Sequence, residues 1–148
     1  MNKTLFALAG LAVAFFPAAV SAEEHEVKML NSLDGEMMVF EPAFLKVAEG
    51  DTVKFVATDK AHNAESILGM VPNGADQWKG KINEEITVTL TEPGLYGYKC
   101  LPHYGMGMVG IIRVGDAPPA NLDEALAIKH PGRAASRMAV LFENVEAD

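Results

Sequence analysis

The sequence predicts a mainly β protein, an antiparallel β-sandwich followed by two C-terminal α-helices. Apolar residues occupy alternate positions in short segments such as 53–57 and 86–90, which is the period of a half-buried strand. Turn-forming pairs such as Asp34-Gly35 and Pro93-Gly94 separate these segments. After Pro118-Pro119 the apolar period changes from two to about 3.6 residues, which is typical of helices. Short strands with regular turns indicate a sandwich.

The length and composition indicate one small domain that does not bind nucleic acid. The chain has 148 residues, of which 49% are hydrophobic, so it can bury a core but is short for a two-domain enzyme. Its 20 acidic and 12 basic residues give a formal charge of -8, whereas phosphate binding requires a basic surface. The single cysteine, Cys100, excludes an intrachain disulfide and a multi-cysteine zinc site.

Residues 1–22 have the features of a cleavable signal peptide. Lys3 supplies the positive start, an apolar run extends from Leu5 to Val20, and Val20-Ser21-Ala22 provides small residues for cleavage. The run is shorter than the about 20 residues that a membrane span needs, so we expect cleavage after Ala22 rather than an uncleaved anchor. The mature chain, residues 23–148, is then a single domain in the periplasm, with no segment inserted in the membrane.

Seven segments are expected to form the strands of the sandwich, which we place at about residues 23–117. The first three are short, and those at 52–57 and 86–90 alternate most clearly. In chain order the segments are 26–30, 37–40, 44–47, 52–57, 86–90, 95–100 and 108–114.

The C-terminal tail, at about residues 121–146, is expected to begin with a short helix. Asn121 is a suitable N-cap, and Glu124 three residues later completes an asparagine version of the capping box. The helix is expected to run to about Lys129, because Pro131-Gly132 then ends it.

The second helix of the tail carries an apolar stripe that would cover one side of the sandwich. The stripe consists of Ala134, Met138, Leu141, Phe142 and Val145. Arg133 and Arg137 lie early in this helix, whereas Glu143 and Glu146 lie late. This arrangement is unfavourable for the helix dipole, so packing must outweigh it.

One loop between two expected strands contains most of the candidate metal ligands. Cys100, His103 and Met108 form a C-x2-H-x4-M pattern, and His62 lies 38 residues upstream of the cysteine. Two imidazoles, one thiolate and one thioether suit copper that cycles between Cu(I) and Cu(II). Zinc would more naturally take another thiolate or a carboxylate. Alternatively, His62 is a hydrogen-bonded surface histidine and Cys100 and Met108 are core residues.

The run G-x-Y-x-Y-x-C-x-P-H-x-G-x-G-M-x-G at residues 94–110, with K-x-H-N at 60–63, resembles the cupredoxins, the type 1 blue copper proteins. The two C-terminal helices make the chain similar to the pseudoazurin family within them. This resemblance implies a Greek-key sandwich and copper bound by His62, Cys100, His103 and Met108. It also implies that Asn63 links the two ligand-bearing segments by hydrogen bonds. His25 and His130 lack such a context and are expected to be structural or exposed.

The resemblance implies a docking surface in which lysines surround an apolar face over His103. The apolar residues of the ligand loop are Pro102, Tyr104 and Met106. The lysines are Lys60, Lys79, Lys81 and Lys99. Such a surface would receive redox partners with an acidic docking face: a copper nitrite reductase, a c-type cytochrome or a peroxidase. The alternative is that these lysines are simply solvated and the loop residues are packing residues.

Three classes of function stay open at this point. The first is a soluble periplasmic one-electron carrier, which the family resemblance connects with denitrification. The second is a periplasmic copper storage or delivery protein, which would favour exposed, exchangeable sites. The third is an enzyme with Cys100 as nucleophile, although no substrate cleft or oxyanion site is evident in the sequence. We expect the electron carrier, not an enzyme, and a monomer.

Overall fold

The computed structural model describes residues 21–147. The predicted signal peptide, residues 1–22, lies outside the described residues except for its last two positions. Within the described range, no helix combines the length and the apolar character that a membrane crossing requires.

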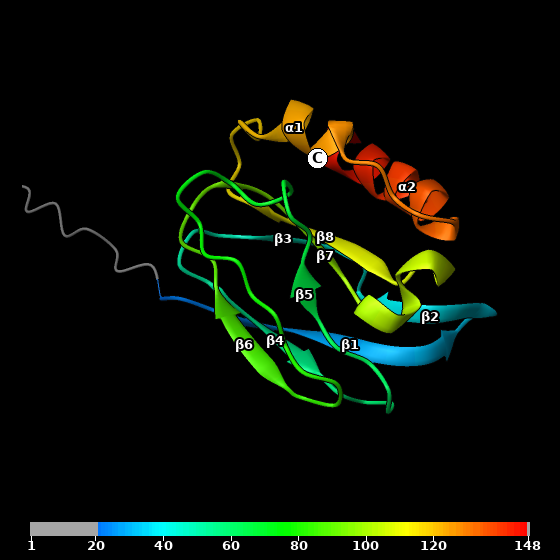
Figure 1. Ribbon diagram of the computed structural model, residues 1–148. Helices are drawn as coiled ribbons and strands as arrows, with labels where there is room; N and C mark the ends of the chain where they lie inside the picture. The colour runs from blue at the N-terminus through cyan, green and yellow to red at the C-terminus, as the bar shows by residue number, and fades with distance from the viewer. Residues whose placement is uncertain (1–20, 148) are drawn as a thin grey trace, which may run out of the picture.

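Two four-stranded sheets face one another and form the sandwich (Figure 1). One sheet has the strand order β2-β1-β4-β6 and the other has the order β3-β8-β7-β5. The strands are β1 (Glu24–Leu33), β2 (Glu36–Glu41), β3 (Phe44–Val47), β4 (Thr52–Val56), β5 (Glu65–Ser66), β6 (Ile86–Thr89), β7 (Gly94–Lys99) and β8 (Val109–Val114).

The sheets are mixed rather than purely antiparallel. The pairs β1–β4 and β3–β8 are parallel, whereas the other neighbours are antiparallel. These two pairs are parallel because the chain crosses to the other sheet between β1 and β4, and again between β3 and β8. Parallel neighbours need such a long crossover, while antiparallel neighbours need only a turn. The alternation of single segments does not reveal these crossovers.

Aromatic rings dominate the core between the two sheets. The ring centroid of Tyr98 lies 4.8 Å from that of Phe40 and 5.0 Å from that of Phe55, both in edge-to-face contact. Cys100 and Met108 are completely buried and belong to the same apolar cluster. Both expected sulfur ligands are therefore held by the rigid core of the fold.

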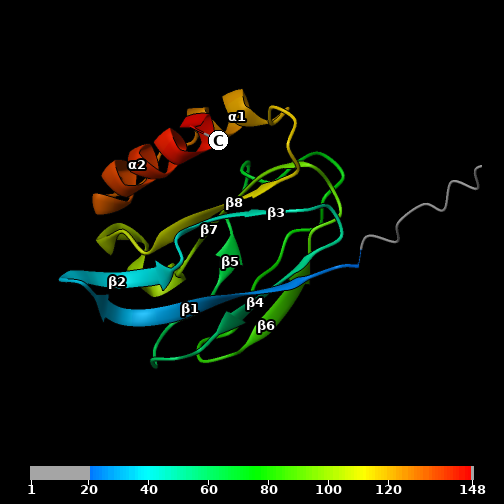
Figure 2. The same ribbon diagram turned by 180° about the vertical axis from the view of Figure 1, so that it is seen from behind.

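Helices α1 (Leu122–Ala127) and α2 (Arg133–Ala147) cover the outer face of the β3-β8-β7-β5 sheet (Figure 2). All five residues of the predicted α2 stripe are buried there, which confirms that prediction. They pack with Leu95 of β7 and Ile111 of β8. Each large apolar side chain buried in this way contributes roughly 1.5–3 kcal/mol. The tail is therefore part of the folded unit.

Asn121 does not cap α1 through its side chain, so the predicted capping box is wrong. Its amide instead accepts a hydrogen bond from the Leu95 N–H and donates one to the Leu95 carbonyl, both at 2.9 Å. Asn121 is thus used to attach the tail to β7. The helix also ends at Ala127 rather than near Lys129, because Ile128 has an extended backbone.

Candidate metal centre

Three of the four expected copper ligands converge on one point. The Nδ1 atoms of His62 and His103 are 3.1 Å apart. The Cys100 Sγ lies 3.7 Å from the first and 3.4 Å from the second. Within the described part of the chain, His62, Cys100 and His103 are the one group of histidine, cysteine and acidic side chains with metal-binding geometry.

Different parts of the fold supply the expected ligands. His62 lies in the connection between β4 and β5, Cys100 follows β7, and His103 lies in the short 3-10 helix η1 (Leu101–Met106). Met108 is held beside them by its backbone, because its carbonyl accepts from the Cys100 N–H at 3.0 Å and its N–H donates to the His103 carbonyl at 3.2 Å. Gly107, with a φ of 96°, makes the turn that this pairing needs.

Hydrogen bonding and burial prepare His62 for a metal. Its Nε2 lies 2.9 Å from the Asn31 side-chain oxygen, which can only accept, so Nε2 carries the proton and Nδ1 keeps a lone pair directed at the centre. Burial, followed by repulsion from His103, lowers the pKa of His62 and favours the neutral ring. The sequence alone does not indicate Asn31 as part of this site. Asn31 can orient His62 only because β1 lies beside β4, and no local sequence motif predicts that contact.

The Cys100 sulfur is buried but does not lack hydrogen-bond donors. Burial raises the pKa of the thiol, while the backbone N–H groups of Asn63 and His103 donate to the sulfur and partly offset this rise. A coordinated metal ion deprotonates such a thiol outright. A donor set of one thiolate and two imidazoles fits copper, and the Met108 thioether is the expected additional soft donor.

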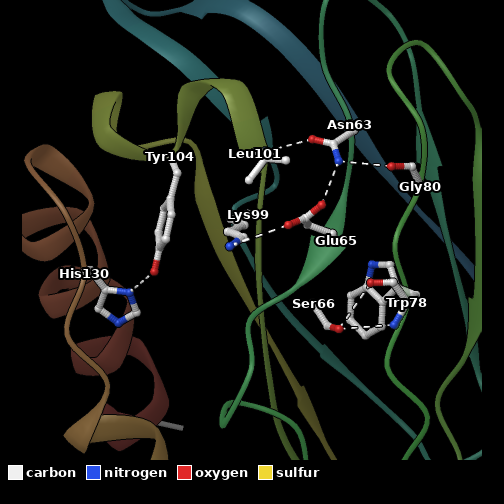
Figure 3. A network of polar contacts seen from close by, with 9 residues as sticks. All are labelled: Asn63, Glu65, Ser66, Trp78, Gly80, Lys99, Leu101, Tyr104 and His130. Atoms are coloured by element: carbon white, nitrogen blue, oxygen red, sulfur yellow. Dashed lines mark hydrogen bonds and ion pairs between the residues drawn. The ribbon is translucent and has the colours of Figure 1, made fainter.

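Asn63 joins the two ligand-bearing segments (Figure 3). Its side-chain oxygen accepts from the Leu101 N–H at 2.7 Å, next to Cys100. Its amide group donates to the Gly80 carbonyl at 3.0 Å and to the Glu65 carboxylate at 3.1 Å. The side chain is 2% exposed, so these bonds are shielded from water.

The structure separates the four candidate lysines into two kinds. Lys60, Lys79 and Lys81 are exposed. The loop with Lys79 and Lys81 lies beside the His62 segment, because the Asn83 N–H donates to the His62 carbonyl at 2.8 Å.

Lys99 differs from the other three because its side chain is only 20% exposed. Its Nζ lies 3.5 Å from the Glu65 carboxylate and 4.8 Å from the centroid of the Tyr104 ring (Figure 3). The charge of Lys99 is thus largely paired with groups of the protein itself.

Exposed apolar residues flank His103 within η1. Pro102 is exposed, Met106 is 42% exposed, and Leu101, which sequence analysis missed, is 49% exposed. Tyr104 is half-buried instead, and its hydroxyl lies 2.7 Å from Nδ1 of His130 (Figure 3). His130 is therefore structural, as is His25, whose Nε2 lies 2.8 Å from the Asp51 carboxylate.

Comparison with known proteins gives the family. Residues 27–115 match the model for copper binding proteins of the plastocyanin/azurin family. A pseudoazurin from Paracoccus pantotrophus is 52% identical over 132 residues, which cover 89% of this chain and 90% of the relative. A pseudoazurin from Methylorubrum extorquens is 45% identical, with 97% of both chains covered. The chain belongs to the pseudoazurins.

Solved pseudoazurin structures have the same fold. One from Sinorhizobium superposes with a TM-score of 0.81 at 52% identity, and the match covers 84% of this chain and 98% of that one. One from Hyphomicrobium denitrificans gives a TM-score of 0.77 at 47% identity, covering 82% and 97%. As a pseudoazurin, the protein is a copper electron carrier with one copper ion, and its three converging donor atoms agree with a type 1 site.

Proposed function

We propose that this pseudoazurin holds its copper with His62, Cys100, His103 and Met108, and that it delivers single electrons in the periplasm to a reductase such as a copper nitrite reductase. The convergence of two imidazole Nδ1 atoms and one sulfur beneath an exposed apolar surface is the observation that carries this proposal. Copper in such a site supplies a one-electron change between Cu(II) and Cu(I).

The surrounding residues keep the ligand positions fixed. Asn31 orients His62, Asn63 ties the His62 segment to the Cys100 segment, and the backbone pairing of Cys100 with Met108 closes the loop. All of these bonds join protein groups, so the fold itself holds the donors in position. Such a site needs little movement when it gains or loses an electron.

His103 is the route by which the electron leaves. His62 has no exposed surface, whereas His103 is only half-buried and lies in the same short helix as the exposed Leu101, Pro102 and Met106. A partner that covers these apolar residues comes close to the ring edge of His103 without direct access to the metal. The small size of this surface favours rapid release after transfer.

Charge selects the partner. The chain has a formal charge of -8, yet Lys60, Lys79 and Lys81 are exposed near the ligand segments. Screening at physiological ionic strength acts over about 8 Å, so the charges nearest the contact decide association. A partner with an acidic docking face, such as a reductase, a c-type cytochrome or a peroxidase, fits this surface. Lys99 contributes less because Glu65 pairs with it.

Export and cleavage after Ala22 give a mature chain that begins at Glu23. Its backbone nitrogen donates to the Asp51 carboxylate at 2.9 Å. A free α-ammonium at this position would form an ion pair with Asp51. N-terminal sequencing of protein released by osmotic shock should identify Glu23 as the first residue, and a chain that keeps residues 1–22 would contradict this assignment.

Stopped-flow kinetics with a copper nitrite reductase test the docking proposal. A variant with Lys60, Lys79 and Lys81 changed to Gln should associate at least about tenfold more slowly at low salt, with a weaker salt dependence. The matched control changes three strand lysines, Lys28, Lys46 and Lys54, to Gln, and should associate at close to the parent rate. Equal rates for the two variants would show that the lysines near the site do not guide docking.

A further inference from the structure

Arg137 of α2 links the helical tail to the ligand loop by hydrogen bonds. Its Nη1 donates to the carbonyl of Gly107 and to the carbonyl of Met38 in β2, both at 2.9 Å. Its Nη2 pairs with the Glu36 carboxylate. The side chain is only 19% exposed, so these bonds are partly shielded from water. One guanidinium therefore connects α2, β2 and the ligand loop.

The Gly107 carbonyl belongs to the peptide bond that leads into Met108. The other side of that peptide, the Met108 N–H, donates to the His103 carbonyl at 3.2 Å. Both polar groups of the peptide are thus held, one by the loop itself and one by Arg137. The contact is close, since a Cβ at Gly107 would lie 2.8 Å from the Arg137 Cδ.

We infer that Arg137 is a positioning residue for the copper site, which fixes the Gly107–Met108 peptide and through it the position of the Met108 side chain. This inference rests on the proposed role of Met108 as a ligand. A thioether would bind copper only weakly, so the position of the Met108 sulfur would depend on the protein framework more than on the metal. Charge-assisted hydrogen bonds to a carbonyl are strong enough to set that framework.

Arg133 provides the matched comparison. It lies one turn earlier on α2 and also pairs with Glu36, at 3.2 Å. However, its side chain is 60% exposed, and within residues 21–147 its side-chain hydrogen bond goes to Glu36 rather than to a loop carbonyl. Attachment of the helix to Glu36 is therefore common to both arginines, while the bond to Gly107 is specific to Arg137.

The test compares Arg137→Met, Arg137→Lys and Arg133→Met in the full mature chain. Amide hydrogen exchange in the copper-free protein should be about tenfold faster at Met108 in Arg137→Met than in Arg133→Met, once both are corrected for global stability. In the copper-loaded protein, Arg137→Met should change the relative intensities of the copper-thiolate bands and shift the reduction potential. Arg137→Lys should lie between Arg137→Met and the parent, because an ammonium can keep one carbonyl bond.

The outcomes are distinguishable. If Arg137→Met and Arg133→Met have the same exchange at Met108, the same spectrum and the same potential, Arg137 merely attaches the helix and the inference is wrong. If Arg137→Met does not fold, the same comparison between Arg137→Lys and Arg133→Met decides. If the copper-loaded parent lacks a thiolate band, the proposed ligand set fails, whereas the exchange measurement still reports whether Arg137 holds the loop.

Discussion

The packing of the tail can be tested with one substitution, Met138→Ala. Met138 is 1% exposed and packs with Leu95 and Ile111 of the sheet. Truncation of a buried methionine to alanine removes apolar contacts and leaves a cavity, which costs about 2–5 kcal/mol. For a domain of this size, each kcal/mol lowers the midpoint by about 4 °C, so Met138→Ala should melt at least about 8 °C below the parent.

The matched control is Val140→Ala, two residues further along the same helix. Val140 is 57% exposed, so its truncation should change the free energy of unfolding by less than about 0.5 kcal/mol. Both variants are measured by thermal and urea unfolding of the copper-free protein, because Met138 is next to Arg137 and copper would add its own stabilisation. If the two variants unfold within about 0.5 kcal/mol of each other, α2 is an appendage and the packing argument fails.

Three further substitutions address the metal site and the N-terminal end. Cys100→Ser should abolish the intense blue absorption of the copper protein, and a full band in that variant would exclude the thiolate bond. Met108→Leu should keep copper and colour but raise the reduction potential, since loss of a weak donor favours Cu(I), and voltammetry would show an unchanged or lower value if the reasoning is wrong. Hydrogen bonds from the Glu23 N–H and then from His25 hold the pKa of Asp51 below its ordinary value of 3.8. Because the pKa of Asp51 is lower in the folded than in the unfolded protein, its carboxylate stabilises the fold at pH values above 3.8. Asp51→Asn should therefore be less stable than the parent at pH 7, and this difference should disappear as the pH falls through the folded pKa. Urea unfolding across a series from pH 7 into acid measures this, and a difference that does not shrink as the pH is lowered would contradict it.

The features that follow from local spacing could be predicted from the sequence. The C-x2-H-x4-M loop places three expected ligands within one short segment, and the proximity of Cys100 and His103 therefore needs little knowledge of the rest of the fold. The stripe of α2 is equally local, because a helix brings residues three and four apart to one face. His62 could be assigned to the expected ligand set by its residue type, since a copper site of this kind needs a second imidazole.

The features that depend on contacts between distant segments could not be predicted. Asn31 reaches His62 because β1 and β4 are parallel neighbours, and Asn121 bonds to Leu95 because α1 packs against β7. Lys99 stands next to a ligand in the sequence, but its pairing with Glu65 follows from the register of β5 on β7. One signal was visible: the early arginines of α2 contradict the helix dipole, and such local conflicts often mark functional positions.

The contacts that the C-terminal tail makes with the ligand loop explain why α2 has arginines near its start despite the helix dipole. The segment that matches the plastocyanin/azurin family ends at residue 115 and contains every proposed ligand. Within residues 21–147, two side-chain hydrogen bonds to the ligand loop nevertheless come from beyond it, that of Arg137 to Gly107 and that between His130 and Tyr104. An arginine early in α2 costs less than about 1 kcal/mol against the dipole, whereas a partly buried charge-assisted bond contributes about 1.5–3 kcal/mol. Because these bonds are made to the ligand loop itself, the tail that covers the sheet also restrains the site. A substitution that loosens α2 should therefore change the spectrum and the reduction potential of the copper.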